Sequence, residues 1–435
     1  MESVSSQIMG ESPIDNYVAN HEERTLDDLF TLLAQPSVSA TGEGVQELTE
    51  LAEEMCLDYG FDETQVFETS GQPAVVAQAH VNGDPDNDRP TVLIYGHYDV
   101  QPVDPSMWET PPFEPTIGSE EGGEDDEERI YARGAGDNTG QWFSHLVAVR
   151  GYRETGELPV NVTLFLDGEE EIGSPYIEEA LDASKDLLEA DMLYMADGPI
   201  DEGGRPQIWL GCRGWLNVQI EARGSNRDLH AGNYGGPIPN PAWELVWLLG
   251  TMKGPDGRIQ IPGFYDDVAE PTDTDPELLA EVPFDPDYIR DELELEGFTR
   301  GPGESYQEKI QLYPTLDITG FTSGYGGEGH KLVLPSRAKA KLVFNLVPDQ
   351  KVDPIFENLE DHIEEHTTGT CEVNLTRYEG EAPAYRTPAS SPYLKPIQDA
   401  LSDVWGTEPV VKPSLGSPAP IAYFFEGLDI PCFIV

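Results

Sequence analysis

Three apolar runs in the first half of the chain end in acidic side chains, and this repeated ending most restricts the possible folds. A short apolar run bounded by polar residues is typical of a strand buried in a sheet. Ligands of open α/β sheets bind beyond the carboxyl ends of the strands, so we expect the side chains that end these runs to converge. They are His97 and Asp99 in "LIYGHYD", Asp167, Glu169, Glu170 and Glu171 in "VTLFLDGEEEIG", and Asp197 in "MLYMADG".

A glycine-rich turn, "ARGAGDNTG", adds Asp137 between the first two of these runs. Carboxylates crowded into one site repel each other, and one or two divalent metal ions relieve that repulsion. His97 with carboxylates and no thiols is the ligand set of a catalytic zinc site, although manganese and cobalt accept the same ligands. Each motif alone has an ordinary alternative. A histidine at a strand end is usually satisfied or at the surface, and "GEEE" in a chain with 82 acids is usually a solvated turn.

The alternation of strands and helices in the N-terminal region predicts an α/β fold with a largely parallel sheet. The runs "PAVVAQAH", "TVLIYGHY", "VNVTLFLD" and "ADMLYMAD" are predicted strands, and "GQWFSHLVAVRGYRE" between the second and third is a predicted helix. Another helix is predicted in "TLDDLFTLLAQPSVSA", with Thr25 as its N-cap and its end before Pro36. The acidic insert 119–129 has no apolar residue and is predicted to be a solvated loop.

The pattern changes near Gly214, which predicts a second domain. The strand "WLNVQIEARG" and the helix "NPAWELVWLLGTMK" come first, a loop is predicted over roughly 255–315, and the strand "RAKAKLVFNLVP" and the helix "PIFENLEDHIEEH" follow. We therefore expect a smaller α+β domain over 214–376, inserted into a catalytic domain made of 1–213 and 377–435.

The charge of the chain excludes several kinds of partner. Asp and Glu number 82 against 25 Lys and Arg, for a net charge of −57. Nucleic acid and anionic membranes are poor partners for such a surface, because both need clustered cations. Salt screens the self-repulsion, so we expect the cytoplasm of a high-salt organism; an ordinary acidic protein is the alternative. Scattered cysteines, the absence of a signal-peptide pattern and the absence of a membrane-length apolar run agree with the cytoplasm.

Five motifs resemble one known family in their order and context. The segments "GHYDVQP", "ARGAGDN", "GEEEIGS", "ADG" and "RDLHAGNYGG" are similar to those of the M20 metallopeptidases, most of all the dipeptidase and carnosinase-like branch. The resemblance implies a zinc-exopeptidase-like catalytic domain with an inserted dimerisation (lid) domain. It also implies a homodimer that hydrolyses the peptide or amide bond of dipeptides or acylated amino acids.

The resemblance further implies a pair of metal ions in each subunit. Asp137 would bridge the ions, His97 and Asp197 would hold one, and Glu171 would hold the other. The bond from Asp137 to Asn138 is cis in the family.

The same resemblance assigns three other roles. Asp99 would orient the ring of His97 from behind and raise its basicity. Glu170 would be the general base that takes a proton from the metal-bridging water. His230, in "RDLHAGNYGG", would reach the partner's active site across the dimer interface and stabilise the oxyanion.

This chain departs from the family pattern near its end. The family takes the last ligand of the second metal from a histidine near the C-terminus, whereas this chain ends at Val435 within "IPCFIV". By comparison with the family we expect a C-terminal truncation. One metal site, of His97, Asp137 and Asp197, is then complete, and the other is short of a ligand.

Substrate-binding positions also differ from the family. The arginine of the family's "FRLVP" is Asn345 in "FNLVP", the family's "R-x-G-G-S" is "PSLGS", and the usual lysine of "GDN" is Thr139. An amide cannot form the charged bidentate clamp of an arginine. Two hypotheses follow: an interrupted product of a gene for an active enzyme, or a strongly impaired or non-catalytic dimeric paralogue that keeps one metal. The departures within the chain favour the second.

A second zinc motif is present in "HIEEH", residues His362 to His366. Both histidines would share one helix face, as in another class of zinc proteases. The alternative is an ordinary amphipathic helix with Ile355, Leu359 and Ile363 on its apolar face, and we favour this interpretation.

Overall fold

The structure is a computed structural model that describes residues 13–119, 128–156, 158–199, 204–378 and 380–435. No helix within these ranges is both long enough and apolar enough to cross a membrane. The chain divides into two compact units. The first comprises residues 1–209, 390–410 and 423–435, and the second comprises residues 210–389 and 411–422.

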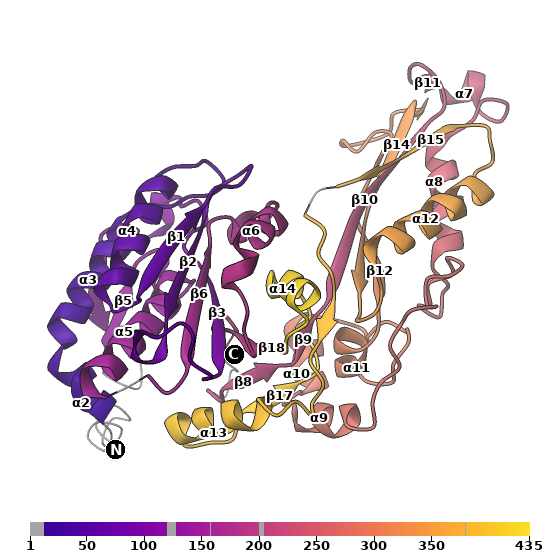
Figure 1. Ribbon diagram of the computed structural model, residues 1–435. Helices are drawn as coiled ribbons and strands as arrows, with labels where there is room; N and C mark the ends of the chain where they lie inside the picture. Colours follow the sequence, from indigo (N-terminus) through magenta and orange to yellow (C-terminus); the bar gives the residue numbers. More distant parts are fainter. Residues whose placement is uncertain (1–12, 120–127, 157, 200–203, 379) are drawn as a thin grey trace. The chain divides into compact units, whose positions relative to one another are not determined.

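An eight-stranded sheet forms the centre of the first unit, and its four middle strands, β6, β3, β7 and β18, run parallel. Antiparallel pairs continue it on both sides, so the predicted largely parallel sheet is confirmed at its centre (Figure 1). The strand order is β1 (Glu63–Phe67), β2 (Ala74–Ala79), β6 (Asn161–Asp167), β3 (Thr91–His97), β7 (Met192–Met195), β18 (Cys432–Ile434), β8 (Gln207–Trp209) and β17 (Val410–Lys412).

Helices pack on both faces of this sheet because its strands are apolar on both sides. On one face, Trp142 and Leu146 of α5 join a buried cluster with residues of α4 and of the strands. On the other face, Phe424 of α14 packs edge-to-face against Tyr95 and Phe165. The helices that lie wholly or mostly in the first unit are α2 (Pro13–Asn20), α3 (Glu22–Ala34), α4 (Val45–Asp58), α5 (Thr139–Thr155), α6 (Ile177–Ser184), α13 (Leu394–Trp405) and α14 (Ile421–Leu428).

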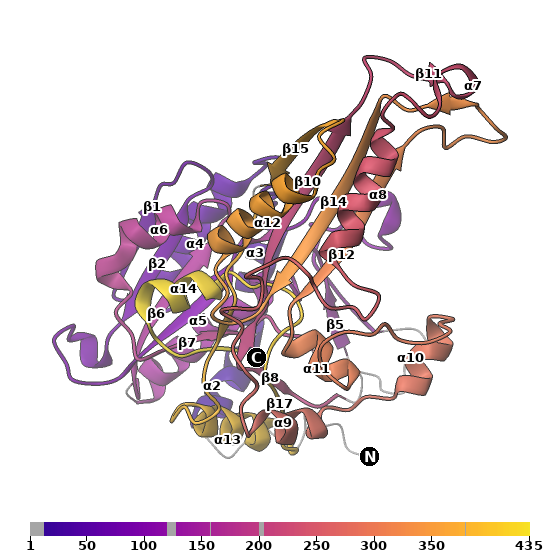
Figure 2. The same ribbon diagram turned by 90° about the vertical axis from the view of Figure 1, so that its right-hand side faces the viewer.

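A four-stranded antiparallel sheet forms the second unit. Its order is β12 (Thr315–Ser323), β14 (Arg337–Leu346), β10 (Gly214–Arg223) and β15 (Glu372–Arg377). Along β10 every second residue from Gly214 to Ala222 is buried, as expected for a sheet with one covered face. Helices α8 (Pro241–Met252) and α12 (Val352–His366) cover that face, and Figure 2 shows both beside the long strands.

Short elements complete both units. The first unit contains the hairpin β4 (Thr116–Ser119) and β5 (Glu128–Tyr131). The second contains β9 (Gly211–Cys212) paired with β16 (Tyr385–Arg386), and β11 (Leu229–His230) paired with β13 (Val333–Leu334). Single turns of 3-10 helix lie at η1 (Val81–Gly83), η2 (Pro105–Met107), η3 (Glu170–Ile172) and η4 (Lys185–Leu187).

Three local predictions need correction. The predicted loop 255–315 contains α9 (Asp275–Glu281), α10 (Pro286–Glu292) and α11 (Tyr306–Gln311). These helices are too short to show apolar periodicity, and N-caps such as the capping box of Ser305 and Glu308 define them instead. Helix α3 begins at Glu22 rather than after Thr25, because Glu22 and Glu23 suit a helix N-terminus. Of the predicted acidic loop, Ser119 ends β4, Glu128 and Arg129 begin β5, and 120–127 lie outside the described residues.

The close packing of Gly96 generates a stability prediction. A Cβ atom built on this residue of β3 would lie 2.9 Å from Trp142 Cβ and 3.0 Å from Asn138 Oδ1. We expect Gly96→Ala to destabilise the protein by about 1–3 kcal/mol, because the core must shift to admit the methyl group. The measurement is the midpoint of guanidinium-induced unfolding.

Gly250→Ala is the matched control, since nothing lies within 4 Å of a Cβ built on Gly250 in helix α8. It should stabilise the protein by about 0.5–1 kcal/mol, because alanine is a better helix former than glycine. Equal midpoints for the two variants would contradict this account of the packing around Gly96.

Candidate metal centre

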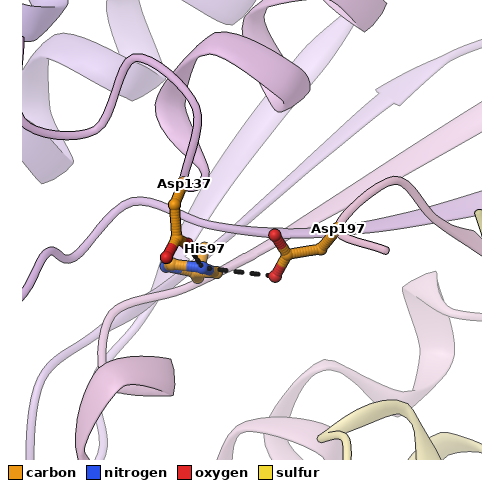
Figure 3. Close-up of side chains that lie close together, drawn as sticks. All are labelled: His97, Asp137 and Asp197. Atoms are coloured by element: carbon orange, nitrogen blue, oxygen red, sulfur yellow. Dashed lines mark ion pairs between the residues drawn. The ribbon is translucent and has the colours of Figure 1, made fainter. Parts of the chain in front are cut away.

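The acidic strand ends of the first unit meet at one edge of its sheet. His97 ends β3 and pairs with Asp167, the last residue of β6. On the other side, Tyr95 pairs with Met195 of β7, so Asp197 follows that strand at the same edge. Asp137 approaches from the turn before α5, and Figure 3 shows its carboxylate and that of Asp197 directed toward the His97 ring.

Three of the predicted ligands are close enough to share one metal ion. The ligand atoms of His97, Asp137 and Asp197 all lie within 4.8 Å of one another, and this is the one such group of three found in the described ranges. His97 Nε2 is 3.1 Å from Asp137 Oδ1 and 3.5 Å from Asp197 Oδ2. The imidazole is fully buried, whereas the Asp137 side chain is 58% exposed. The centre is therefore open on the side of Asp137.

The charges at this centre perturb each other strongly. Burial lowers the pKa of His97, but the surrounding carboxylates outweigh burial and raise it well above its ordinary value. The His97 ring in turn lowers the pKa of Asp137, against the effect of burial. The carboxylates therefore favour a positive charge at the position of the His97 ring.

The chemistry of the donors fits a divalent metal ion. His97 Nε2 is buried and makes no hydrogen bond, although carboxylate oxygens of Asp137 and Asp197 lie close to it. A metal ion among these atoms would accept the lone pair of the nitrogen and neutralise the carboxylates. One nitrogen and two oxygens is also a ligand set found in catalytic zinc sites.

Asp99 holds the centre together from behind. It is fully buried, and Oδ1 of its carboxylate lies 3.3 Å from His97 Nδ1. The hydrogen-bond partner of Nδ1 is the Asp99 backbone carbonyl, at 3.1 Å. The two carboxylate oxygens accept hydrogen bonds from the backbone N–H groups of Glu170 and Glu171, both at 3.1 Å. Asp99 therefore positions His97 and the two glutamates of the next strand end at once.

The two glutamates differ in environment. Burial, together with the negative charge of Asp197, raises the pKa of Glu170 to about 8, although His97 opposes the rise. Glu170 Oε2 lies 4.0 Å from His97 Nε2. Burial also raises the pKa of Glu171, whose carboxylate accepts hydrogen bonds from Gln101 N–H at 3.2 Å and Gln101 Nε2 at 2.8 Å.

Three further residues support this edge of the sheet, and of these only Asp167 was expected there from the sequence. Asn138 accepts a hydrogen bond from His97 N–H and donates one to Ala196 O, so it ties β3 to the segment that carries Asp197. Asp167 accepts hydrogen bonds from Tyr95 and Ser174 and from the Glu169 backbone. Gln101 donates hydrogen bonds to the Glu171 carboxylate from its backbone N–H and its side-chain amide. Asn138 and Gln101 lie within the motifs "GAGDN" and "GHYDVQP", which was the available signal. The Asp137–Asn138 bond is cis, as the resemblance implied.

The remaining sequence-predicted residues lie in the second unit, apart from Thr139. His230 is exposed, and its Nδ1 accepts a hydrogen bond from Gly232 N–H. Asn345 lies on β14 and donates to Thr315 Oγ1. Thr139 is buried at the start of α5.

The "HIEEH" motif shows no metal site. The imidazole rings of His362 and His366 stack with their centroids 4.1 Å apart, and His362 Nε2 lies 2.9 Å from Thr251 Oγ1. Ile355, Leu359 and Ile363 are buried, as an amphipathic helix requires, and within the described chain no third ligand joins the two histidines.

Comparisons with known sequences agree with this geometry. The profile of Peptidase family M20/M25/M40 matches residues 93–435. The chain is 30% identical over 360 residues to Beta-Ala-His dipeptidase of Homo sapiens, a match that covers 81% of this chain and 68% of the relative. It is 29% identical over 325 residues to a Cys-Gly metallodipeptidase of Schizosaccharomyces pombe, a match that covers 73% of this chain and 66% of the relative. The chain thus spans about two thirds of the length of these curated relatives.

A solved structure supports the same fold. An M20 family metallo-carboxypeptidase from Sulfolobus solfataricus matches with a TM-score of 0.81 and 35% sequence identity. The match covers 94% of this chain and 90% of that protein, so it includes both units.

The hydrogen bonds of Asp99 predict its effect on metal binding. Asp99→Asn replaces one acceptor oxygen by a donor, so at least one backbone N–H of Glu170 or Glu171 loses its partner. We expect about 10- to 100-fold weaker binding of a divalent metal ion, because residues behind a ligand fix its orientation. Competition with a chromophoric chelator measures the affinity.

Asp104→Asn removes the same charge at an exposed position and is the matched control. Equal metal affinities for the two variants would show that Asp99 does not position the ligands.

Proposed function

The chain belongs to peptidase family M20/M25/M40, and from this premise we propose that it is a metallodipeptidase. The observation that carries the proposal is the cluster of His97, Asp137 and Asp197 at the carboxyl edge of the sheet, with Glu170 beside it. The named activities of the relatives, on Cys-Gly and Beta-Ala-His, point to dipeptides as the substrate class, with acylated amino acids as a related class.

His97, Asp137 and Asp197 are the proposed metal-binding residues. Zinc suits this nitrogen and oxygen set, and manganese or cobalt would fit the same ligands. The described residues support one site of three ligands, and Glu171 with Asp137 would contribute to a second ion. When bound, a divalent ion would polarise the scissile carbonyl and lower the pKa of a water molecule.

Glu170 is the proposed general base. Burial raises the pKa of this group, so once deprotonated its carboxylate is a stronger base than that of an exposed glutamate. The hydrogen bond from its backbone N–H to Asp99 holds the residue in position. Asp99 itself touches neither water nor substrate in this proposal, and acts through His97 and Glu170.

A homodimer through the second unit is part of the proposal, with His230 acting in the partner's active site. Trp243 and Trp247 of α8 stack on each other at 5.6 Å, and each is 55% exposed. Edge strand β12 exposes Ile318 and Phe321. An exposed apolar surface of this kind is typical of a protein interface. The first unit is then the catalytic domain and the second the inserted dimerisation domain.

A strongly impaired paralogue that keeps one metal is the alternative function. Asn345 and Thr139 favour it, because neither supplies the positive charge that the family pattern has at its position. Measured turnover on dipeptides separates the two functions.

The cytoplasm of a high-salt organism stays our proposal for the location. The net charge of −57 supports it, as do four cysteines that form no disulfide.

Metal removal and substitution of Glu170 test the proposed chemistry. We expect the protein to hydrolyse Cys-Gly or β-Ala-His, to lose activity with a chelator, and to regain it with Zn²⁺, Mn²⁺ or Co²⁺.

Glu170→Gln should lower kcat by about 10²- to 10⁴-fold, because it removes the proton acceptor. Its metal content should stay unchanged. Glu178→Gln, on the first turn of α6, is the control. Full activity of Glu170→Gln would exclude this role.

A mixing experiment tests the dimeric active site. Glu170→Gln and His230→Ala should each be inactive as homodimers. If His230 acts in the partner's site, exchanged subunits form mixed dimers with one intact site, and activity should recover to about a quarter of wild type. Mixed dimers that form but stay inactive would refute action across the interface.

A further inference from the structure

Every polar group of Glu171 has a hydrogen-bond partner within the first unit, and Gln101 is the partner of all but one. The Gln101 backbone N–H donates to Glu171 Oε1 at 3.2 Å, and its side-chain Nε2 donates to Oε2 at 2.8 Å and to the Glu171 carbonyl oxygen at 2.9 Å. The remaining group, the Glu171 N–H, donates to Asp99 at 3.1 Å. Gln101 and Glu171 are 70 positions apart in the chain, so this clamp forms only in the fold.

The neighbouring Glu170 is held differently. Its N–H also donates to Asp99, at 3.1 Å. Within the described residues, however, its carboxylate accepts no hydrogen bond, and its ion-pair partner there is His97 Nε2 at 4.0 Å. A carboxylate that takes a proton from water must be free to reach it, whereas a metal ligand must keep one orientation. The same strand end therefore carries one free carboxylate and one fixed carboxylate.

The backbone around Gln101 is fixed, although its side chain is exposed. Val100 is buried and donates its N–H to Ser37 O at 2.8 Å. Pro102 follows Gln101, and a proline restricts the residue before it to extended conformations. Gln101 therefore holds Glu171 from an anchored position.

The hydrogen bonds from Gln101 leave Glu171 able to bind a cation. A carboxylate oxygen has two lone pairs, and each oxygen of Glu171 uses one of them to accept from Gln101. The second lone pair of each oxygen is available to a metal ion. A glutamate side chain loses rotamer freedom when it binds an ion, and a side chain that is fixed beforehand has less freedom to lose.

We propose that Gln101 is a positioning residue for the second metal ion, because it fixes the carboxylate of Glu171. Gln101 touches neither ion nor substrate in this proposal. None of its hydrogen bonds within the described chain reaches a ligand of the first ion, His97, Asp137 or Asp197. The affinity for the first ion should therefore not depend on it. The inference rests on the proposed function in one respect, since the second ion belongs to that proposal.

Titration of the metal-free full-length protein with Mn²⁺, followed by electron paramagnetic resonance, tests the proposal. The signal of free Mn²⁺ counts the bound ions, and two neighbouring Mn²⁺ ions give the spectrum of a magnetically coupled pair. We expect the wild-type protein to bind two ions in two steps, with the coupled spectrum appearing in the second step. The measurement needs no turnover of a dipeptide.

Gln101→Met removes the side-chain amide and keeps the length of the side chain. We expect it to weaken the second step about 10- to 100-fold and to move the coupled spectrum to higher Mn²⁺ concentration, because residues behind a ligand fix its orientation. The first step should stay as in the wild type, which also shows that the variant is folded. Gln65→Met, at an exposed position of the edge strand β1, is the matched control.

Asp99→Asn should give a contrasting result and weaken the first step as well, because Asp99 lies behind His97 and also accepts from Glu171. A Gln101→Met variant that weakens both steps equally, weakens neither, or tightens the second would overturn the proposal. A wild-type protein that binds a single ion would overturn it too. A protein that shows the expected pattern but hydrolyses no dipeptide would contradict the proposed function alone.

Discussion

The buried carboxylate of Asp99 is the interaction on which the metal centre depends. A carboxylate without exposure needs several donors to offset its desolvation. Asp99 has the backbone N–H groups of Glu170 and Glu171, and its oxygen lies beside His97 Nδ1. Because the two N–H donors follow β6 whereas His97 ends β3, one side chain couples the position of a metal ligand to that of the proposed base.

Crowded negative charge at the metal centre and unpaired positive charge at Arg213 are two forms of the same electrostatic problem. In the first unit, acids gather around His97, and their mutual repulsion suits a site completed by a cation. In the second unit, Arg213 is buried and donates hydrogen bonds to neutral oxygens only. In both places the isolated fold leaves a polar atom unsatisfied, His97 Nε2 in one case and Arg213 Nε in the other.

Much of the fold could be read from local pattern. The apolar runs that end at His97, Asp167 and Asp197 are strands of one sheet, and the alternation with helices established the α/β class. Where the reading failed, the local signal was weak. Helices α9, α10 and α11 have no more than seven residues each, which is too few for an apolar face to repeat. The roles of His230 and of the individual ligands stay predictions that biochemical measurement must decide.

The sequence by itself determined which chemical groups stand at the strand ends, because strand periodicity and the polar residues that stop it are local properties. Only the tertiary structure decided which of these groups meet. The two backbone N–H groups that donate hydrogen bonds to the Asp99 carboxylate lie 71 and 72 residues away in the chain. Thr315 joins Arg213 and Asn345 across 102 and 30 residues. Such pairs depend on strand order and register, which follow from the packing of the whole sheet and leave no mark in any short stretch of sequence.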